Sequence, residues 1–302
     1  MGTELALLDV ARTLQLEVHS QESQRAYKGD VLVFKEWLEQ EGLGDLSQVE
    51  YDTMLRYHAH LLTTYAKATA ARRFVVARRL LEVAVKRKVI EENPAASIRS
   101  KIRRDDSSSH TALSKKEAKR LLAAVDTTTP MGKRDYALLM LLIYGGLRRS
   151  ECADIRLEDI SLKQEHYVLT IQSGKGDKRR DVPLRPDVFR AIRHYLEAVG
   201  RQNDHPHAHL FTGFTKGGKQ TNRGITDRQI ANIVKGHAGK AEVTATPHDL
   251  RASAITFLFD TGAPIVVIQR LVGHNDPKTT EGYYTRKQDL DNSPVYKVDL
   301  NT

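Results

Sequence analysis

The chain has 302 residues, 40% of them hydrophobic, with 47 lysines and arginines against 38 acidic residues and a net charge of +9. This length favours two domains, each with its own core, and the basic balance suits a polyanionic partner such as nucleic acid. The single cysteine, Cys152, excludes an internal disulfide framework and favours the reducing cytoplasm. The longest apolar run, residues 136–147, is shorter than the about 18 residues that a membrane span needs. We expect no secretion signal, because Glu4 and Asp9 interrupt the N-terminus.

The first third of the chain is predicted to be helical throughout. Apolar residues recur there every three or four positions, and glycines and a proline interrupt the pattern. The segments with this spacing lie near residues 5–18, 21–41, 50–64 and 67–91. In the last of them, Val76, Leu80 and Val83 form the stripe that we expect to be buried.

The remaining faces of the helix expected over 67–91 are strongly basic. A charge run is commonly only a solvated face, but Glu82 is the only acid among eight cations between residues 67 and 88. A helix that faces DNA is therefore the favoured interpretation. The candidate DNA-binding residues are Arg72, Arg73, Arg78, Arg79, Lys86 and Arg87.

A polar, non-periodic stretch separates the two predicted domains. Residues 98–110 read IRSKIRRDDSSSH, with basic residues first, then acids, then serines. Such a composition is typical of a linker. We therefore predict a first domain over 1–98, a linker over 99–110 and a second domain over 111–302.

Local signals predict a mixed second domain, mainly helical with a small antiparallel sheet. Ser114 and Glu117 have capping-box spacing and predict a helix start. The apolar run over 134–144 predicts a buried helix that ends at the following pair of glycines. Strands are predicted over 166–172 and 179–184, joined by a turn over 173–178.

Two basic residues of this domain lie where the backbone would hold them. Arg148 follows the buried helix and its glycine turn, whereas Arg149 is interpreted as a surface residue. Lys175 lies in a Gly-Lys-Gly turn, whose permissive backbone would lift the ammonium group clear of the sheet. The two interpretations of Lys175 are a solvated hairpin tip and a proton donor to a leaving oxygen.

Imidazole and guanidinium groups share a helix in the segment over 244–285. Thr246 is a predicted N-cap, Pro247 suits the first helical position, and Gly262 is a predicted helix end. His248 and Arg251 are three residues apart, so both project from one face of that helix.

Further along, a second helix from Pro264 is predicted to end at Gly273, directly before His274. A short third helix, opening at 276–277, carries Tyr283 and Tyr284. Attack of a tyrosine hydroxyl on a phosphodiester needs cations on the phosphate oxygens and proton-transfer groups beside them. Arginine matches two phosphate oxygens, and histidine moves protons near neutrality. The segment therefore holds the groups that this chemistry requires.

Two other motifs are assigned no chemistry. The sequence GFTKGGKQ over 213–220 resembles a nucleotide-binding P-loop, but it ends in Gln220, and we expect neither a buried strand before it nor a helix after it. His205, His207 and His209 alternate, but no carboxylate or cysteine cluster joins them. We therefore expect no metal and no cofactor.

Taken in order, five motifs that carry six key residues resemble the tyrosine recombinase (phage integrase, Xer-like) family. The motifs are GLRRSE, GKGDKRRDVPL, PHDLR (two residues), LVGH and TTEGYYT. They span the second domain, and the basic helical first domain is similar to the SAM-like core-binding domain of that family. Ala252 and Val272 stand where the family often has histidine and leucine.

The resemblance implies a fold, a reaction and partners. It implies a helical DNA-binding domain and a mainly α, α+β catalytic domain that close on DNA as a clamp. The implied reaction is site-specific recombination through a 3′-phosphotyrosyl intermediate and a Holliday junction, without a cofactor. The implied partners are double-stranded DNA target sites and further copies of the chain, a dimer on each site and a tetramer on two.

The resemblance also implies roles for single residues. Arg148 and Arg251 would hold the scissile phosphate, and Lys175 would be the general acid. His248 would assist the proton of the nucleophile, His274 would bond the phosphate, and Tyr283 would attack. Glu151 resembles a supporting acidic residue of the family, and the pair of tyrosines leaves the nucleophile open. Strand relaxation of the type IB topoisomerase kind and a catalytically silent DNA-binding regulator are the alternative functions.

Overall fold

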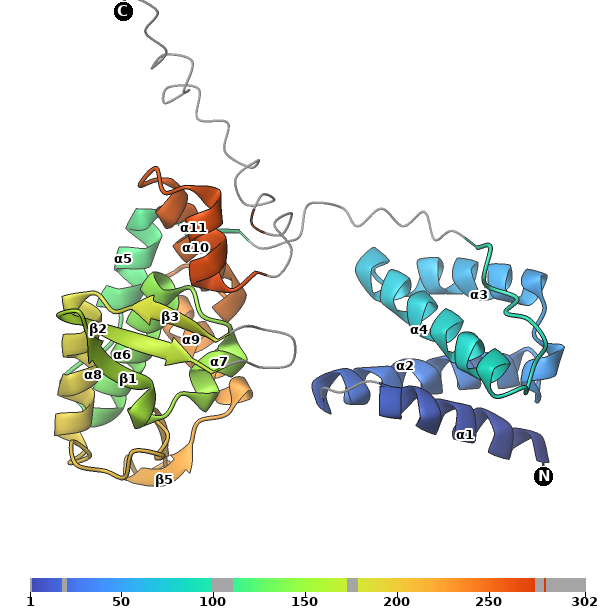
Figure 1. Cartoon of the computed structure of the whole chain (residues 1–302), viewed down its shortest axis with the longest axis horizontal. Coiled ribbons are helices and arrows are strands. Elements are labelled where there is room, and N and C mark those ends of the chain that lie inside the picture. Colours follow the sequence, from blue (N-terminus) through green and yellow to red (C-terminus); the bar gives the residue numbers. More distant parts are fainter. Residues whose placement is uncertain (1, 18–20, 99–110, 173–178, 275–279, 281–302) are drawn as a thin grey trace, which may run out of the picture. The chain divides into compact units, whose positions relative to one another are not determined.

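The computed structural model describes residues 2–17, 21–98, 111–172, 179–274 and 280. The chain separates into two compact units, Met1–Ser108 and Ser109–Thr302. Each has a core of its own, as the length of the chain predicts. The observed architecture, a helical first unit followed by a mainly helical unit with small antiparallel sheets, confirms the fold class predicted from the sequence (Figure 1).

The first unit is built from α-helices joined by short connections (Figure 1). They are α1 (Gly2–Glu17), α2 (Gln21–Gln40), α3 (Tyr51–Thr64) and α4 (Lys67–Lys86), with a 3-10 turn, η1 (Leu46–Gln48), before α3. Helix α4 packs against the other three helices. Its apolar stripe of Val76, Leu80 and Val83 is buried, as predicted.

Helix α4 ends earlier than the sequence analysis expects. It stops at Lys86, and Lys88 adopts a positive φ of 57°. The amide of Val89 then donates to the carbonyl of Ala84, which is the wrapped end typical of a left-handed C-terminal cap. Because this cap uses a lysine instead of glycine, the sequence contains no stop signal at this position.

The second unit is arranged around α6 (Pro130–Gly145), which is buried along almost its whole length. Gly146 ends it with φ +60°, as the glycine pair predicts. It begins four residues before the predicted run, with Thr129 as the N-cap and Pro130 in the first position. The helices that surround it are α5 (Lys115–Ala123), α7 (Arg149–Asp154), α8 (Pro186–Ala198), α9 (Asp227–Lys240), α10 (Pro247–Phe259) and α11 (Ile265–Val272). Helices α8 and α10 make extensive contacts with α6.

A three-stranded antiparallel sheet lies beside these helices, in the order β1-β2-β3 (Figure 1). Its strands are β1 (Ile160–Lys163), β2 (His166–Ile171) and β3 (Arg180–Pro183). The sequence analysis predicts β2 and β3 but misses β1, which has four residues and no fully buried side chain. The 3-10 turn η2 (Leu157–Asp159) precedes β1.

The segment that resembles a P-loop is a β-hairpin. Strand β4 (Thr212–Phe214) pairs with β5 (Gln220–Gly224), and the lysine-rich stretch is the turn between them. The expectation that no buried strand precedes the motif is wrong, since Thr212 and Gly213 are buried. A strand follows the glycines where a P-loop has a helix, so the motif cannot present a helix N-terminus to phosphates.

No helix in the described part of the chain is long and apolar enough to span a bilayer.

Candidate active site

Arg148 is fixed by the turn that ends α6 and by the first residues of α7. It is the N-cap residue of α7, and its amide donates to Oε2 of Glu151 at 2.7 Å while Nη1 donates to Oε1 at 2.9 Å. The left-handed Gly146 allows the close packing of this turn, because a Cβ there would lie 3.2 Å from Val272. Arg148 is therefore held at both its backbone and its side chain.

Helix α10 carries the predicted His248 and Arg251. Thr246 caps it in a capping box with Asp249, and Pro247 occupies its first position, as predicted. Arg251 is 2% exposed and donates to the carbonyl of Gly146 at 2.6 Å. His248, one turn earlier, is exposed at the start of the helix. The helix thus places one cation deep in the site and one imidazole at its surface.

The end of α11 is the meeting point of the site. Gly273 ends this helix with φ +69°, and His274 follows directly. The last carbonyls of a helix have no partner within the helix. Here Leu271, Val272 and Gly273 each accept a hydrogen bond from a different arginine, at 2.7–2.9 Å. The donors are Arg180, Arg251 and Arg148, in that order.

The sequence analysis misses Arg180, the first residue of β3. Its guanidinium forms a two-pronged pair with Glu151, with Nη1–Oε1 at 2.9 Å and Nη2–Oε2 at 2.8 Å. Its side chain is 8% exposed. The sequence does contain a signal for Arg180. Side chains two apart on a strand share a face, and the apolar Val182 indicates that this face is buried. Arg180 therefore belongs to the inward face of β3.

The charges of the site set the protonation states of its acid and its imidazole. Burial alone would raise the pKa of Glu151, but hydrogen bonds and charge from Arg180 and Arg148 lower it overall, so the carboxylate is ionised. Burial, together with Arg251, Arg148, His248 and Arg180, lowers the pKa of His274 to about 4. The His274 imidazole is therefore neutral at neutral pH.

Cys152 does not take part in this chemistry. It is fully buried, and burial raises the pKa of its thiol well above the ordinary value, with the neighbouring Glu151 adding to the effect. A thiol that stays protonated is a poor nucleophile.

The structure brings three predicted residues together and leaves others undescribed. Arg148, Arg251 and His274 meet at the end of α11, and His248 is close enough for its charge to lower the pKa of His274. Lys175 lies outside the described residues, and so do Tyr283 and Tyr284. Their placement remains a prediction from the sequence.

The space beside Arg148 is too small for a typical small-molecule ligand. It measures about 150 Å³ and is lined by Glu151, Asp154, Thr170 and Gln172, among others. Sites for such ligands usually enclose about 300–1,000 Å³. One arginine, Arg148, lines this hollow together with the acids Glu151, Asp154 and Asp159, so the hollow itself indicates no ligand.

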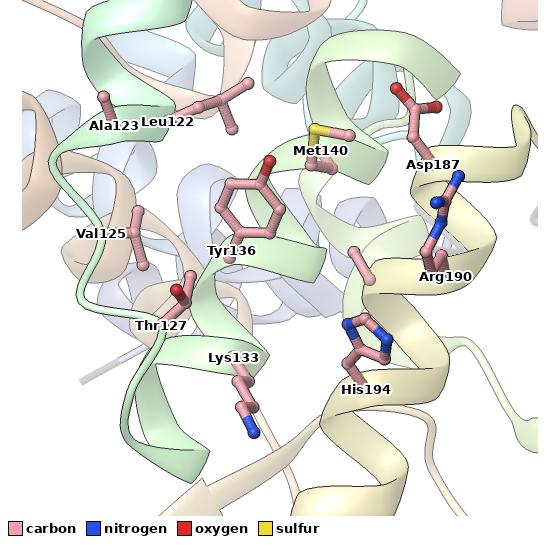
Figure 2. Close-up of a pocket in the computed structure, with 11 residues that line it drawn as sticks. Leu122, Ala123, Val125, Thr127, Lys133, Tyr136, Met140, Asp187, Arg190 and His194 are labelled. Atoms are coloured by element: carbon pink, nitrogen blue, oxygen red, sulfur yellow. The ribbon is translucent and has the colours of Figure 1, made fainter.

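A separate hollow of about 550 Å³ lies between α5, α6 and α8 (Figure 2). Lys133, Tyr136, Arg190 and His194 line it, and Leu122 and Met140 contribute apolar surface. None of the candidate active-site residues lines it. The hollow is thus a different feature from the arginine-lined site.

In the first unit, several candidate DNA-binding cations contact acids on other helices. Arg72 and Arg73 both pair with the buried Asp30 of α2, and Arg73 also stacks over the ring of Tyr65 at 3.8 Å. Lys86 donates to Glu17 at 3.2 Å. Arg78 pairs with Glu82 of its own helix and Arg79 with Glu17, whereas Arg87 donates to Asp9 and Thr13 in the middle of α1. Within the sequence of this segment, Glu82 is the only acid that offsets the cations. The other acids, Asp30 and Glu17, come from distant positions in the chain.

Among the described residues, no group of three or more His, Cys, Asp or Glu side chains is arranged to hold a metal ion. His207 of the alternating histidines instead pairs with Glu158 at 2.6 Å.

Both units match known protein families. Residues 111–290 match the Phage integrase family, and residues 11–88 match the N-terminal SAM-like domain of phage integrases. These ranges include every candidate active-site residue.

Relatives extend the match over nearly the whole chain. Tyrosine recombinase XerD of Lacticaseibacillus casei is 30% identical over 283 residues, which is 91% of this chain and 90% of the relative. Tyrosine recombinase XerD of Listeria innocua is 35% identical over 184 residues, 60% of this chain and 59% of the relative. The crystal structure of the XerH site-specific recombinase, bound to palindromic difH substrate as a post-cleavage complex, has a TM-score of 0.77 at 18% identity. That comparison covers 98% of this chain and 97% of the other, and it supports the fold.

Proposed function

Because the chain belongs to the phage integrase family of tyrosine recombinases, we propose that it recombines DNA at specific sites through a 3′-phosphotyrosyl intermediate and a Holliday junction. The observation that carries the proposal is the convergence of Arg148, Arg251 and His274 at the end of α11. Two fixed guanidinium groups and a neutral imidazole beside them suit a phosphodiester that gains negative charge as it is attacked.

Each predicted residue has one role in this proposal. Arg148 and Arg251 hold the non-bridging oxygens of the scissile phosphate. The Tyr283 hydroxyl attacks phosphorus and passes its proton toward His248. The bond to the 5′-oxygen breaks, and Lys175 protonates that oxygen as it leaves. His274 donates a hydrogen bond to the phosphate throughout.

The energetics explain why so many groups are needed. A tyrosine hydroxyl has a pKa of about 10 and is a poor nucleophile at neutral pH. Preorganised donors on the developing charge contribute roughly 3 kcal/mol each when removed singly. Because the phosphotyrosine bond preserves the energy of the broken phosphodiester, rejoining requires no nucleotide. Two arginines, two histidines and a lysine would supply the positive charge that Mg²⁺ could otherwise provide.

The proposal includes the domains, partners and location. Residues 1–98 form a core-binding domain, 99–110 a linker and 111–302 the catalytic domain. The basic residues of α4 and its C-cap that contact phosphates are Arg72, Arg73, Arg78, Arg79, Lys86 and Arg87. A dimer binds each double-stranded DNA site, and a tetramer joins two sites in the cytoplasm, where the free Cys152 stays reduced.

Footprinting of the purified protein on the DNA that flanks its own gene defines the site to be tested. A nicked suicide substrate carrying that site should then form a covalent protein–DNA adduct, equally well in EDTA and in Mg²⁺. Site-specific binding without an adduct would favour the silent regulator. Relaxation of supercoiled plasmid without a partner site, and no strand exchange between two sites, would favour the topoisomerase. Loss of adduct in EDTA with recovery in Mg²⁺ would overturn the metal-free mechanism.

A further inference from the structure

We propose that Arg180 is a positioning residue of this active site, which fixes Arg148 and His274 through Glu151 and the end of α11. The inference rests on the proposed function, because it assigns Arg180 to the same cleavage reaction. The described hydrogen bonds of Arg180 go to Glu151 and Leu271 and to none of the proposed reacting groups. Arg180 therefore acts only through its neighbours.

Its first connection is the carboxylate of Glu151. Both oxygens of Glu151 accept from Arg180 and also from Arg148, the latter through its amide and Nη1. The Glu151 carboxylate can orient the Arg148 guanidinium only while the Arg180 guanidinium holds that carboxylate in place. Arg180 therefore fixes the oxygens against which Arg148 is aligned.

Its second connection is the helix end before His274. Nε of Arg180 donates to the carbonyl of Leu271 at 2.9 Å, one residue before the carbonyl bound by Arg251 and two before the one bound by Arg148. Arg180 is the one of these three arginines that is not proposed to contact phosphate. It can hold the helix end whether or not DNA is bound.

The Arg180 guanidinium packs directly against the backbone of Gly273. A Cβ at Gly273 would lie 2.7 Å from Nη1 and 2.9 Å from Cζ of Arg180, so the guanidinium occupies the space that a side chain would need. The adjacent Arg179 is exposed and offers a matched control with the same charge.

The pH dependence of cleavage distinguishes positioning from a purely structural role. The charged groups that face Glu151 are Arg148, Arg180 and Arg251, and Asp154 and Asp159 line the same small hollow. Burial raises the pKa of Glu151, and hydrogen bonds from Arg180 are the largest effect that opposes it. Without Arg180, Glu151 should take up a proton at a higher pH, and cleavage should then fail at a higher pH than in the wild type.

The experiment compares Arg180→Gln, Arg180→Lys, the control Arg179→Gln, Glu151→Gln and the double variant Arg180→Gln/Glu151→Gln. The rate of adduct formation on the suicide substrate is measured from pH 5 to pH 9, with half-site affinity and thermal unfolding alongside. Arg180→Gln should cleave roughly 10- to 100-fold more slowly, the range found when partners that orient a ligand are removed. Its half-site affinity should stay close to that of the wild type. Arg179→Gln should cleave normally.

Arg180→Lys and the double variant test the connection through Glu151. Arg180→Lys keeps the charge without the fork and should recover part of the rate. The double variant should be no slower than the slower single variant, because both changes interrupt the same connection.

Normal cleavage by Arg180→Gln would overturn the inference and leave the proposed function standing. So would additive losses in the double variant, or a loss of rate with an unchanged pH profile. Absence of an adduct with the wild-type protein would overturn the proposed function and this inference together. If Arg180→Gln does not fold, Arg180→Lys decides, since a normal rate and pH profile in that variant would contradict a need for the fork.

Discussion

The imidazole of His274 lies beside a buried threonine, with Nδ1 2.8 Å from Oγ1 of Thr280. A neutral imidazole has one nitrogen that donates and one that accepts. If His274 is to donate to a phosphate through Nε2, then Nδ1 must be the acceptor and the Thr280 hydroxyl must donate to it. The contact can therefore support the tautomer that the proposed role requires.

We predict that Thr280→Val slows adduct formation and that Thr280→Ser does not. Valine keeps the shape of threonine but cannot donate, so the imidazole is no longer held in the required tautomer. The loss should be roughly two- to tenfold, the rate equivalent of one net hydrogen bond of about 0.5–1.5 kcal/mol. Cleavage by Thr280→Val at the wild-type rate would show that another group orients His274.

Protonation of His274 should make stability depend on pH. Its pKa lies near 4 in the folded protein, mainly because it is buried, against an ordinary value of 6.5. As the pH falls below about 6.5, the unfolded chain binds a proton that the folded chain still refuses. The stability contributed by the neutral imidazole is therefore full above that pH, declines toward pH 4 and changes no further below it.

Urea unfolding between pH 8 and pH 4 measures this effect. The free energy of unfolding of His274→Gln should decline less steeply over the window than that of the wild type. Carboxylates titrate in both proteins, so the difference between the two curves isolates His274. Parallel curves would contradict the neutral, buried imidazole.

We predict that Gly273→Ala is more harmful than Gly262→Ala, although both glycines have positive φ, +69° and +78° respectively. A left-handed conformation costs an alanine roughly 1–2 kcal/mol. At Gly262 nothing lies within 4 Å of the added Cβ, so that cost alone applies. At Gly273 the Cβ must also displace the guanidinium of Arg180.

Chemical denaturation and adduct formation check this pair. Gly262→Ala should lose about 1 kcal/mol of stability and cleave normally. Gly273→Ala should be less stable still and should cleave poorly. Equal effects of the two substitutions would show that Arg180 moves aside at little cost.

Sequence alone predicts the elements whose ends carry their own signals. The capping box of Ser114 and Glu117, the proline after Thr246 and the glycine before His274 all mark helix ends that the structure has. Local spacing also places His248 and Arg251 on one helical face, and the glycine turn after the buried helix singles out Arg148. These signals succeed because capping is a local interaction between near neighbours in the chain.

Contacts between distant segments escape such an analysis. Arg180 is one of two adjacent arginines in the sequence. Its spacing from Val182 places it on the inward face of β3, but its pairing with Glu151, 29 residues earlier, is what identifies it as part of the site. Asp30 likewise meets Arg72 from 42 residues away, which a charge count along α4 cannot show. The edge strand β1 (ISLK) alternates apolar and polar residues, but four residues are too few to identify a strand from sequence.

We predict that Lys175→Ala blocks cleavage while half-site binding stays nearly intact. The proposed role is donation of one proton to the leaving 5′-oxygen, which contributes little to affinity. A substrate with sulfur at the 5′-bridging position has a leaving group that needs no proton, so it should restore cleavage by the variant. Without such rescue, Lys175 would be a positioning residue.

The last prediction concerns which of two adjacent tyrosines attacks. On a helix, one residue rotates the side chain by roughly 100°, so Tyr283 and Tyr284 cannot both face the same phosphate. The family pattern places the nucleophile nine residues after the Gly-His histidine and three after the second threonine of the Thr-Thr pair. Counting from His274 and from Thr280 leads in both cases to Tyr283.

Tyr283→Phe should therefore abolish the covalent adduct and keep DNA binding, whereas Tyr284→Phe should retain measurable recombination. The two variants are matched, since each loses one hydroxyl and keeps its ring, and Tyr284 is expected to contribute packing. Peptide mapping of the trapped adduct identifies the modified residue directly. An adduct on Tyr284 would mean that the segment after Thr280 is shifted by one residue relative to the family pattern, because His274 must reach the same phosphate as the attacking hydroxyl.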